Sequence, residues 1–146
     1  MRVLGVDYGD RHIGLALSDP LLITAQPLGA YELTGRDDAD RAYFRGLVER
    51  HEVSEIVVGD PLRMDGSLGT RAGLTRRFAD WLAEAAGRPV ALLDERLTTQ
   101  QALKALDGSR LRGRKKKGWE DRLAAVIILS TYLERKRGES GDRQGD

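Results

Sequence analysis

The sequence predicts an α/β fold, in which a mixed sheet of five strands carries helices on both faces. Three observations lead to it. The chain opens with two apolar runs that flank a short polar turn, the pattern of a β-hairpin. Two later apolar runs, 56–59 and 90–93, are short and uninterrupted, as in strands buried on both faces of a parallel sheet. Segments with helical spacing of apolar residues separate these runs, so β-α-β crossovers are expected.

The first half of the chain is expected to supply three strands and one helix. Strands are predicted over 2–6 and 12–18, and a weaker one over 27–33. Residues 37–50 place their apolar side chains at the spacing of an amphipathic helix. The first three strands therefore form an antiparallel start to the sheet.

The second half supplies the remaining strands and helices. Beyond the two buried strands, helices are predicted over 70–86, from Thr98 through Leu106, and over 120–134. From Lys136 on, Gly, Ser and charged residues predict a frayed tail. We expect a single domain over 1–136 and a flexible charged tail over 137–146.

The predicted topology brings acidic residues to one edge of the sheet. Right-handed crossovers place the fourth and fifth strands beside the first and parallel to it, which gives the order 3-2-1-4-5 with the second strand antiparallel. The C-terminal ends of the first, fourth and fifth strands then share a rim where open α/β sheets bind ligands. Asp7, Asp60 and the pair Asp94-Glu95 end these strands. Because side chains alternate, only one of Asp94 and Glu95 can share a site with Asp7, and the pattern leaves open which one.

Composition limits the chemistry available at this rim. The chain has no cysteine and two histidines, so a metal ion would be bound by carboxylates, which suits Mg²⁺ or Mn²⁺. Several carboxylates at one rim repel one another unless a cation lies between them. Divalent ions held in this way catalyse phosphodiester displacement. No apolar run is long enough to span a membrane and no secretory leader precedes the first strand, so a cytoplasmic protein without membrane contact is expected.

Charge distribution adds a candidate nucleic-acid contact. The net charge is only +1, but residues 110–117 hold six Arg and Lys side chains and no acid. Such a block either contacts nucleic acid or forms a solvated loop. A further acid, Asp121, lies in the first turn of the last predicted helix, where it either interacts with the helix dipole or joins the rim.

An ordered set of short motifs resembles a known family. The motifs are Gly5-Val6-Asp7-Tyr8-Gly9, Arg11-His12-Ile13-Gly14, Val57-Val58-Gly59, Pro61-Leu62, Met64-Asp65-Gly66-Ser67, Asp94-Glu95-Arg96-Leu97-Thr98-Thr99 and Asp121-Arg122-Leu123-Ala124-Ala125. Together they resemble the YqgF/RuvX family of Holliday-junction-resolvase-like proteins, and the likeness covers nearly all of residues 1–133. The resemblance implies a ribonuclease H-like fold. It also implies a metal-dependent nuclease that processes the 5′ end of precursor 16S rRNA in ribosome biogenesis.

The resemblance also implies roles for individual residues. It places the acidic triad, catalytic and binding Mg²⁺ or Mn²⁺, on Asp7, Glu95 and Asp121. Asp60 stands where the family usually has an apolar residue, and it either caps the following loop or adds a metal ligand. The residues expected to contact the phosphate backbone are Arg11, Arg63, Ser67, Arg96, Arg112, Arg114, Lys115, Lys116 and Lys117. For Ser67 and its loop, a helix-capping turn is the alternative.

The sequence is also compatible with other functions. A Holliday junction resolvase acting on four-way DNA is the main alternative, and a non-catalytic nucleic-acid-binding or ribosome-assembly factor is a further one. Actin-like ATPases and sugar kinases also open with an Asp-x-Gly turn, but they need a second lobe for which 146 residues leave no room. A junction resolvase needs two sites and hence a homodimer, whereas an rRNA nuclease can act as a monomer.

Overall fold

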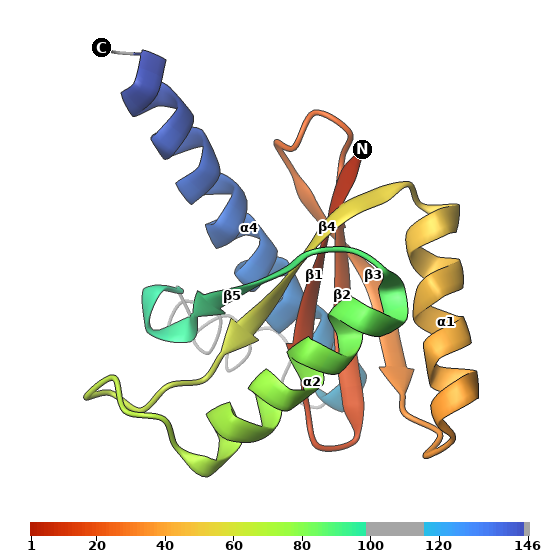
Figure 1. Cartoon of the computed structure of the whole chain (residues 1–146). Helices are drawn as coiled ribbons and strands as arrows, with labels where there is room; N and C mark the ends of the chain where they lie inside the picture. The colour runs from red at the N-terminus through yellow and green to blue at the C-terminus, as the bar shows by residue number, and fades with distance from the viewer. Residues whose placement is uncertain (99–115, 145–146) are drawn as a thin grey trace.

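The computed structural model of this chain describes the backbone of residues 1–98 and 116–144, with side chains described over 1–98 and 122–139 (Figure 1). Its elements follow in the order β1 (Arg2–Tyr8), β2 (His12–Ser18), β3 (Ala25–Glu32), α1 (Asp37–Arg50), β4 (Val53–Asp60), α2 (Thr70–Ala86), β5 (Val90–Asp94), the 3₁₀ turn η1 (Glu95–Leu97) and α4 (Lys116–Gln144). The fold is of the α/β class.

The sheet has the predicted topology. Its five strands run in the order β3-β2-β1-β4-β5. β1 pairs with β2 in antiparallel fashion and with β4 in parallel fashion, and β5 lies parallel to β4 at the edge. The C-terminal ends of β1, β4 and β5 therefore lie at one rim of the sheet, as expected from the crossovers.

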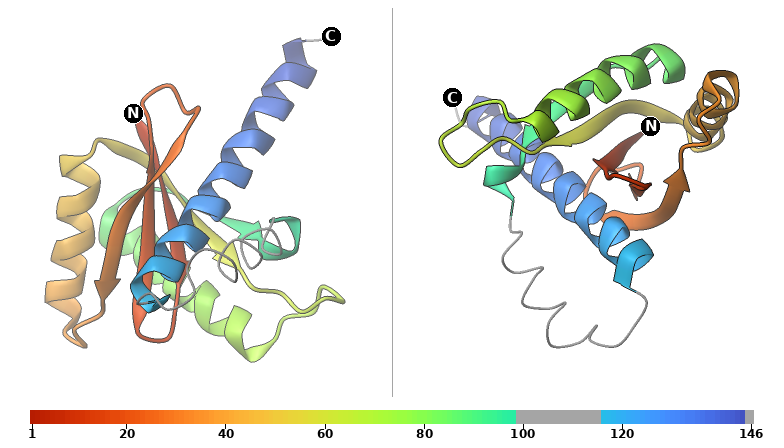
Figure 2. Two further views of the ribbon diagram at one scale, coloured as in Figure 1. Left: turned by 180° about the vertical axis from the view of Figure 1, so that it is seen from behind. Right: turned by 90° about the horizontal axis from the view of Figure 1, so that it is seen from below.

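Helices cover both faces of this sheet (Figure 2). On one face, α1 and α2 pack on alternate residues of the strands, in a core that includes Leu4, Val6 and Phe44. On the other face, α4 packs over Val3, Val57 and Leu93 in a second core. This alternation assigns every strand residue near the rim to either the α2 face or the α4 face.

Two glycines of the sheet face α4 at close range. A Cβ atom built on Gly5 in β1 would lie 2.7 Å from the Cβ of Leu129 and 3.1 Å from the carbonyl oxygen of Ala125. A Cβ atom on Gly59 in β4 would lie 2.6 Å from the Cδ1 of Ile128. A side chain at position 5 would press on the Cβ and backbone of the helix itself, so only glycine fits there, whereas a side chain at position 59 would first displace the flexible end of the Ile128 side chain. Gly5 therefore sets how closely α4 approaches β1, and Gly59 leaves room for Ile128 beside β4.

The bounds of α1, α2 and β2 agree with the predictions, and those of the other elements differ. β1, β3 and β4 are longer than predicted, and β1 reaches Tyr8, so Asp7 belongs to the strand. The predicted helix over 98–106 lies outside the described residues except for its first position. Within the described part of the chain, no helix is long and apolar enough to cross a membrane.

The C-terminal region differs most from the sequence-based expectation. The backbone of α4 is helical through Gln144, although an irregular tail was expected from residue 137. The helix remains docked beyond Leu133, because Lys136 pairs with Glu55 of β4 and the Arg137 guanidinium donates to the carbonyl oxygens of Leu22 and Ile23. These contacts between distant segments stabilise a helical backbone that the local Gly and Ser content disfavours.

Candidate active site

Asp7 and Glu95 lie on the same face of the sheet. Asp7 alternates with Val3 and Gly5, which both face α4. Glu95 opens the turn η1 immediately after β5. Its Cγ atom would be 3.1 Å from a Cβ built on Gly59, next to the same α4 residue, Ile128. Both carboxylates therefore belong to the α4 side of the rim.

Asp94 faces the other way, as the alternation requires. Its neighbour Leu93 packs in the core beneath α4. The Asp94 carboxylate accepts hydrogen bonds from the Arg96 guanidinium at 2.6 and 3.0 Å and from the Arg96 backbone N–H at 2.9 Å. The geometry thus favours Glu95 as the neighbour of Asp7 and leaves Asp94 with a structural role at the start of η1.

The environment of Glu95 opposes its ionisation. Burial raises the pKa of the Glu95 carboxyl above its usual value, and the negative charges of Asp60 and Asp94 raise it further. The positive charge of Arg71 lowers the same pKa in part. A cation beside Glu95 would relieve both the burial cost and the repulsion.

Asp121 lies in α4, and its side chain is outside the described set. Its backbone position is one helical turn before Ala125, the residue whose carbonyl oxygen approaches Gly5. Among the side chains that the structure describes, no group of three or more His, Asp or Glu could hold a metal ion. A three-carboxylate site at this rim therefore depends on Asp121.

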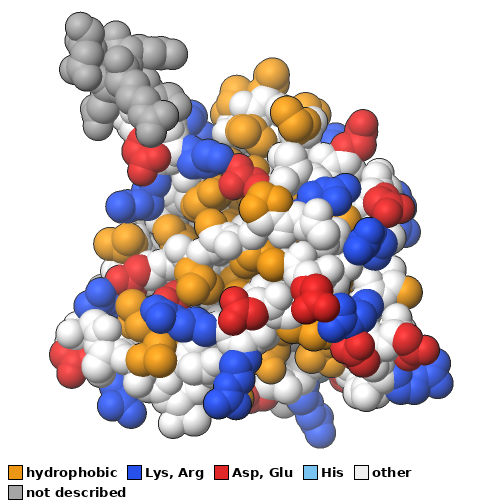
Figure 3. All heavy atoms as spheres, viewed as in Figure 1, with side chains coloured by type: hydrophobic (Ala, Val, Ile, Leu, Met, Phe, Trp, Pro, Cys, Tyr) orange, Lys and Arg blue, Asp and Glu red, His pale blue; other side chains and the backbone are white. Residues whose placement is uncertain are grey.

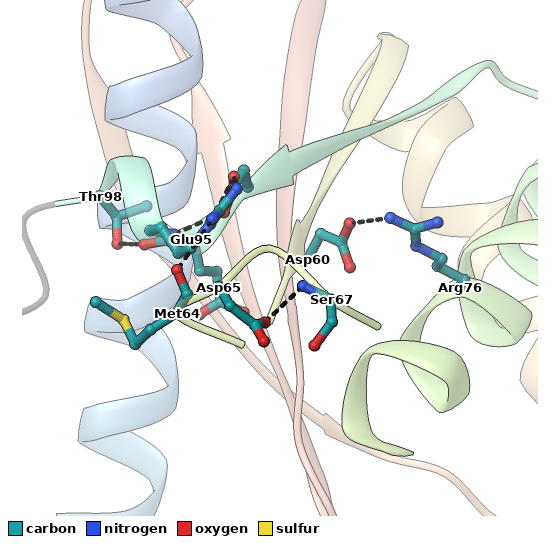
Figure 4. A network of polar contacts seen from close by, with 9 residues as sticks. Asp60, Met64, Asp65, Ser67, Arg76, Glu95 and Thr98 are labelled. Atoms are coloured by element: carbon teal, nitrogen blue, oxygen red, sulfur yellow. Dashed lines mark hydrogen bonds and ion pairs between the residues drawn. The ribbon is translucent and has the colours of Figure 1, made fainter. Parts of the chain in front are cut away.

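The loop between β4 and α2 is held in a tight turn at the rim. The Arg63 N–H donates to the Ser67 carbonyl oxygen at 3.1 Å, and the Gly66 N–H donates to the Arg63 carbonyl oxygen at 2.8 Å. The Asp65 carboxylate accepts the Ser67 N–H at 2.9 Å (Figure 4). The loop does not cap α2 through a side chain, since Gly69 is the N-cap residue.

Of the predicted phosphate contacts, Arg96 has a clear structural partner. Besides Asp94, its guanidinium donates to the Met64 carbonyl oxygen at 3.3 Å, so it ties the β4–α2 loop to the end of β5. Arg63 and Arg11 are exposed, in this loop and in the β1–β2 turn. The remaining predicted contacts lie outside the described side chains: Arg112, Arg114, Lys115, Lys116 and Lys117.

The structure adds three side chains near the rim that the sequence alone does not indicate: Arg71, Asp10 and Arg76. The Arg71 guanidinium, from the first turn of α2, pairs with Asp10 and donates to the Tyr8 carbonyl oxygen at 2.9 Å. Arg76, one turn later on α2, pairs with Asp60 at 2.8 Å between Nη2 and Oδ2. Figure 4 shows this pair on the α2 side of the rim, across from Glu95. These contacts join elements far apart in the sequence, and no local motif signals them.

Asp60 does not behave as a loop cap. Within the described part of the chain its side chain accepts no backbone N–H, and it is bound by Arg76 alone. The side chain is only 5% exposed, compared with 45% for Arg76. The surface around the loop and α2 displays several Arg side chains interspersed with acidic ones (Figure 3).

Comparison with known proteins identifies the family. The profile described as "RuvX: Holliday junction resolvase" matches residues 1–135. The chain belongs to the RuvX family. RuvX relatives named "Putative pre-16S rRNA nuclease" include one from Halothermothrix orenii, 45% identical over 91% of this chain and 94% of its own length. Another, from Pelotomaculum thermopropionicum, is 42% identical over 98% of this chain and 95% of its own length.

Solved structures agree on the fold of this RuvX chain. RuvC of T. thermophilus in complex with a Holliday junction substrate superposes with a TM-score of 0.59 at 20% identity, over 94% of this chain and 96% of that one. The yeast mitochondrial Holliday junction resolvase Ydc2 superposes with a TM-score of 0.51 at 14% identity, over 90% and 77%. The resolvase-like, ribonuclease H-like fold predicted from the motifs is confirmed. Family and fold together make this RuvX protein a hydrolase of phosphodiester bonds.

Proposed function

We propose that Asp7, Glu95 and Asp121 form the hydrolytic site of this nuclease and that its substrate is the 5′ end of precursor 16S rRNA. One observation carries the assignment of the site. Asp7 and Glu95 both lie on the α4 side of the rim, where Gly5 lets α4 pack closely against the sheet. The position of Asp121 along α4 is one turn from that contact.

The donor set fits a divalent cation. Asp7 and Glu95 offer carboxylate oxygens, which Mg²⁺ and Mn²⁺ prefer, and Asp121 would supply a third carboxylate. Burial and neighbouring negative charge disfavour an ionised Glu95, a cost that a cation would offset. A bound divalent ion would supply a Lewis acid that stabilises charge on the phosphate and lowers the pKa of a water molecule.

The protein's own residues would orient the substrate strand. The β4–α2 loop, tied to β5 by Arg96, stands beside the rim, and exposed arginines in this loop and in the β1–β2 turn can contact phosphates. Arg71 bridges α2 to the end of β1, so it keeps the strand that carries Asp7 in a fixed relation to α2. The Arg110–Lys117 block would add further sequence-independent contacts.

Sequence identity to known proteins favours precursor rRNA over a four-way junction as the substrate. The relatives named for pre-16S rRNA share 42–45% identity with this chain over almost their whole length. The resolvases share 14–20% sequence identity with this chain, which supports a common fold only. Cleavage of four-way DNA is the second candidate, because the family description itself names a resolvase. An rRNA nuclease would act in the cytoplasm and could be a monomer, whereas a resolvase would need a homodimer.

A cleavage panel tests the substrate. Precursor 16S rRNA segments, unstructured single strands and four-way DNA junctions are incubated with the protein and Mn²⁺ or Mg²⁺. We expect cleavage of the rRNA segment near the mature 5′ end and no paired cuts in the junction. Selective, symmetric cutting of the junction by a dimer would instead support the resolvase.

Asp7→Asn tests the site. The substitution removes a carboxylate charge and with it several kcal/mol of transition-state stabilisation. The cleavage rate should fall about 10²- to 10³-fold, while the unfolding transition remains cooperative. Asp94→Asn is the matched control, since it removes an adjacent carboxylate from the opposite face and should keep most of the rate. Wild-type cleavage by Asp7→Asn would refute the assignment.

A further inference from the structure

A buried carboxylate on the α2 side of the rim holds an arginine at the surface. Asp60 is the last residue of β4, and its side chain is 5% exposed. Oδ2 accepts the Nη2–H of Arg76 at 2.8 Å. Oδ1 is buried and has no hydrogen-bond partner among the described residues. Burying this carboxylate costs free energy of folding, because the group loses its hydration and only one of its oxygens gains a partner among the described residues.

The fold itself does not require that cost. An apolar side chain at position 60 would be buried without this cost, and Arg76, whose side chain is 45% exposed, would remain hydrated without a partner. Asp60 also neither caps the loop nor belongs to a described group that could hold a metal ion. What the buried Asp60 carboxylate does in this structure is to hold the Arg76 guanidinium in one position.

The placement of Arg76 suits contact with a nucleic-acid strand. It stands in the second turn of α2, and its side chain is 45% exposed. A guanidinium has five N–H donors in a planar fork, and among the described contacts only one of them is used. In the pairing of β4 with β5, Asp60 lies opposite Asp94, the residue before Glu95, so the ion pair lies near the proposed hydrolytic site. Figure 4 shows Arg76 and Glu95 on opposite sides of Asp60.

We propose that Arg76, held by the buried Asp60 carboxylate, binds a backbone phosphate of the substrate strand on the α2 side of the Asp7–Glu95 site. The planar fork of arginine matches phosphate oxygens, and a guanidinium held in advance loses less side-chain entropy on binding. Asp60 is a positioning residue, because it acts only through Arg76. The inference rests on the proposed function and names a strand-binding group of that same site.

Equilibrium binding without divalent metal tests the proposal independently of cleavage. The probe is a fluorescein-labelled precursor 16S rRNA segment, with a labelled four-way DNA junction as a second arm, titrated in EDTA at several salt concentrations. Arg76→Ala should raise Kd about tenfold and reduce the salt slope by about one phosphate contact, or 0.7 to 0.9. Arg76→Lys should recover part of the affinity and the whole slope. Arg50→Ala, on an exposed arginine at the opposite end of the sheet, is the matched control and should change neither quantity.

A double-mutant cycle separates positioning from a merely structural role. Asp60→Asn should raise Kd by less than Arg76→Ala does, leave the salt slope intact and have little further effect once Arg76 is alanine. Asp60→Leu serves the same purpose if the asparagine variant does not fold. Should Arg76→Ala bind with the Kd and salt slope of Arg50→Ala, the proposal is overturned. A failure of the proposed hydrolytic site would be seen separately, as retained cleavage by Asp7→Asn.

Discussion

At the scale of single residues, Glu95 should make stability depend on pH. Burial raises the folded-state pKa of its carboxyl, so the unfolded state releases its proton at lower pH than the folded state does. The protonated folded form is stable at acidic pH, and this contribution is lost as pH rises through the folded-state pKa. Glu95→Gln should therefore unfold at a higher temperature than wild type at pH 7 without metal. The difference should disappear near pH 3, as thermal unfolding at a series of pH values would show.

The same variant should respond differently to metal. Ligands that bind only the folded state raise the unfolding temperature, so Mn²⁺ should stabilise wild type and have little effect on Glu95→Gln. Glu49→Gln, on an exposed glutamate of α1, is the control and should follow wild type in both conditions. A Glu95→Gln variant less stable than wild type at pH 7 without metal would contradict this account of the burial.

Sequence patterns predicted which acids lie at the rim of the sheet better than they predicted the arginine pairs around it. Strand alternation limited the partner of Asp7 to one of two adjacent acids, and the contacts of Gly59 favour Glu95. The pairs Arg71–Asp10 and Arg76–Asp60 join α2 to the hairpin and to β4. Such pairs depend on how helices lie on the sheet, which residue spacing within one segment does not encode.

At the scale of elements, the closeness of α4 to β1 depends on Gly5. A Cβ at this position would meet the Leu129 side chain at 2.7 Å and a helix carbonyl oxygen at 3.1 Å. Gly5→Ala should therefore cost about 1–3 kcal/mol of unfolding free energy, measured by urea denaturation. It should also lower the cleavage rate, because displacing α4 would shift Asp121, a member of the proposed hydrolytic site, relative to β1.

A second glycine gives the matched control for Gly5. Gly46 lies inside α1, and a Cβ there would meet nothing within 4 Å. Gly46→Ala should stabilise the protein by about 0.5–1 kcal/mol, since alanine favours a helix interior. Equal destabilisation by both substitutions would show that the α4 contact is not what requires glycine at position 5.

Element bounds were predictable where a segment carries its own signals. The ends of α1 and α2 agree with the apolar spacing, and Gly87 ends α2 in the left-handed conformation at φ 67°, which glycine favours. β4 begins three residues earlier than its apolar run, because Val53 pairs with Arg2 of β1. The extension of α4 likewise depends on contacts with β4 and with the β2–β3 turn. The start of β4 and the end of α4 are therefore both set by contacts with residues distant in the sequence.

At the scale of the whole molecule, chain connectivity was enough to predict the order of the strands. A hairpin start followed by right-handed crossovers favours β4 beside β1 with β5 beyond it, and the sheet has this order. The arrangement gathers acids and arginines at one rim from segments as far apart as Asp7 and Glu95, which are 88 residues apart in the chain, even though the net charge is only +1. Affinity for nucleic acid must then come from local basic groups, not from the overall charge.

The Lys115–Lys117 run should be one of these groups. Replacing all three lysines by alanine should weaken binding of the labelled rRNA segment at low salt and flatten the salt dependence, by up to about 0.7 per lost contact on a single strand and 0.9 on a duplex. Combined with Arg76→Ala, the losses in slope should add, because separate phosphates are contacted. Circular dichroism would verify that the variant remains folded. A salt slope equal to wild type would assign these lysines to solvent and leave the arginines of the rim as the electrostatic contact.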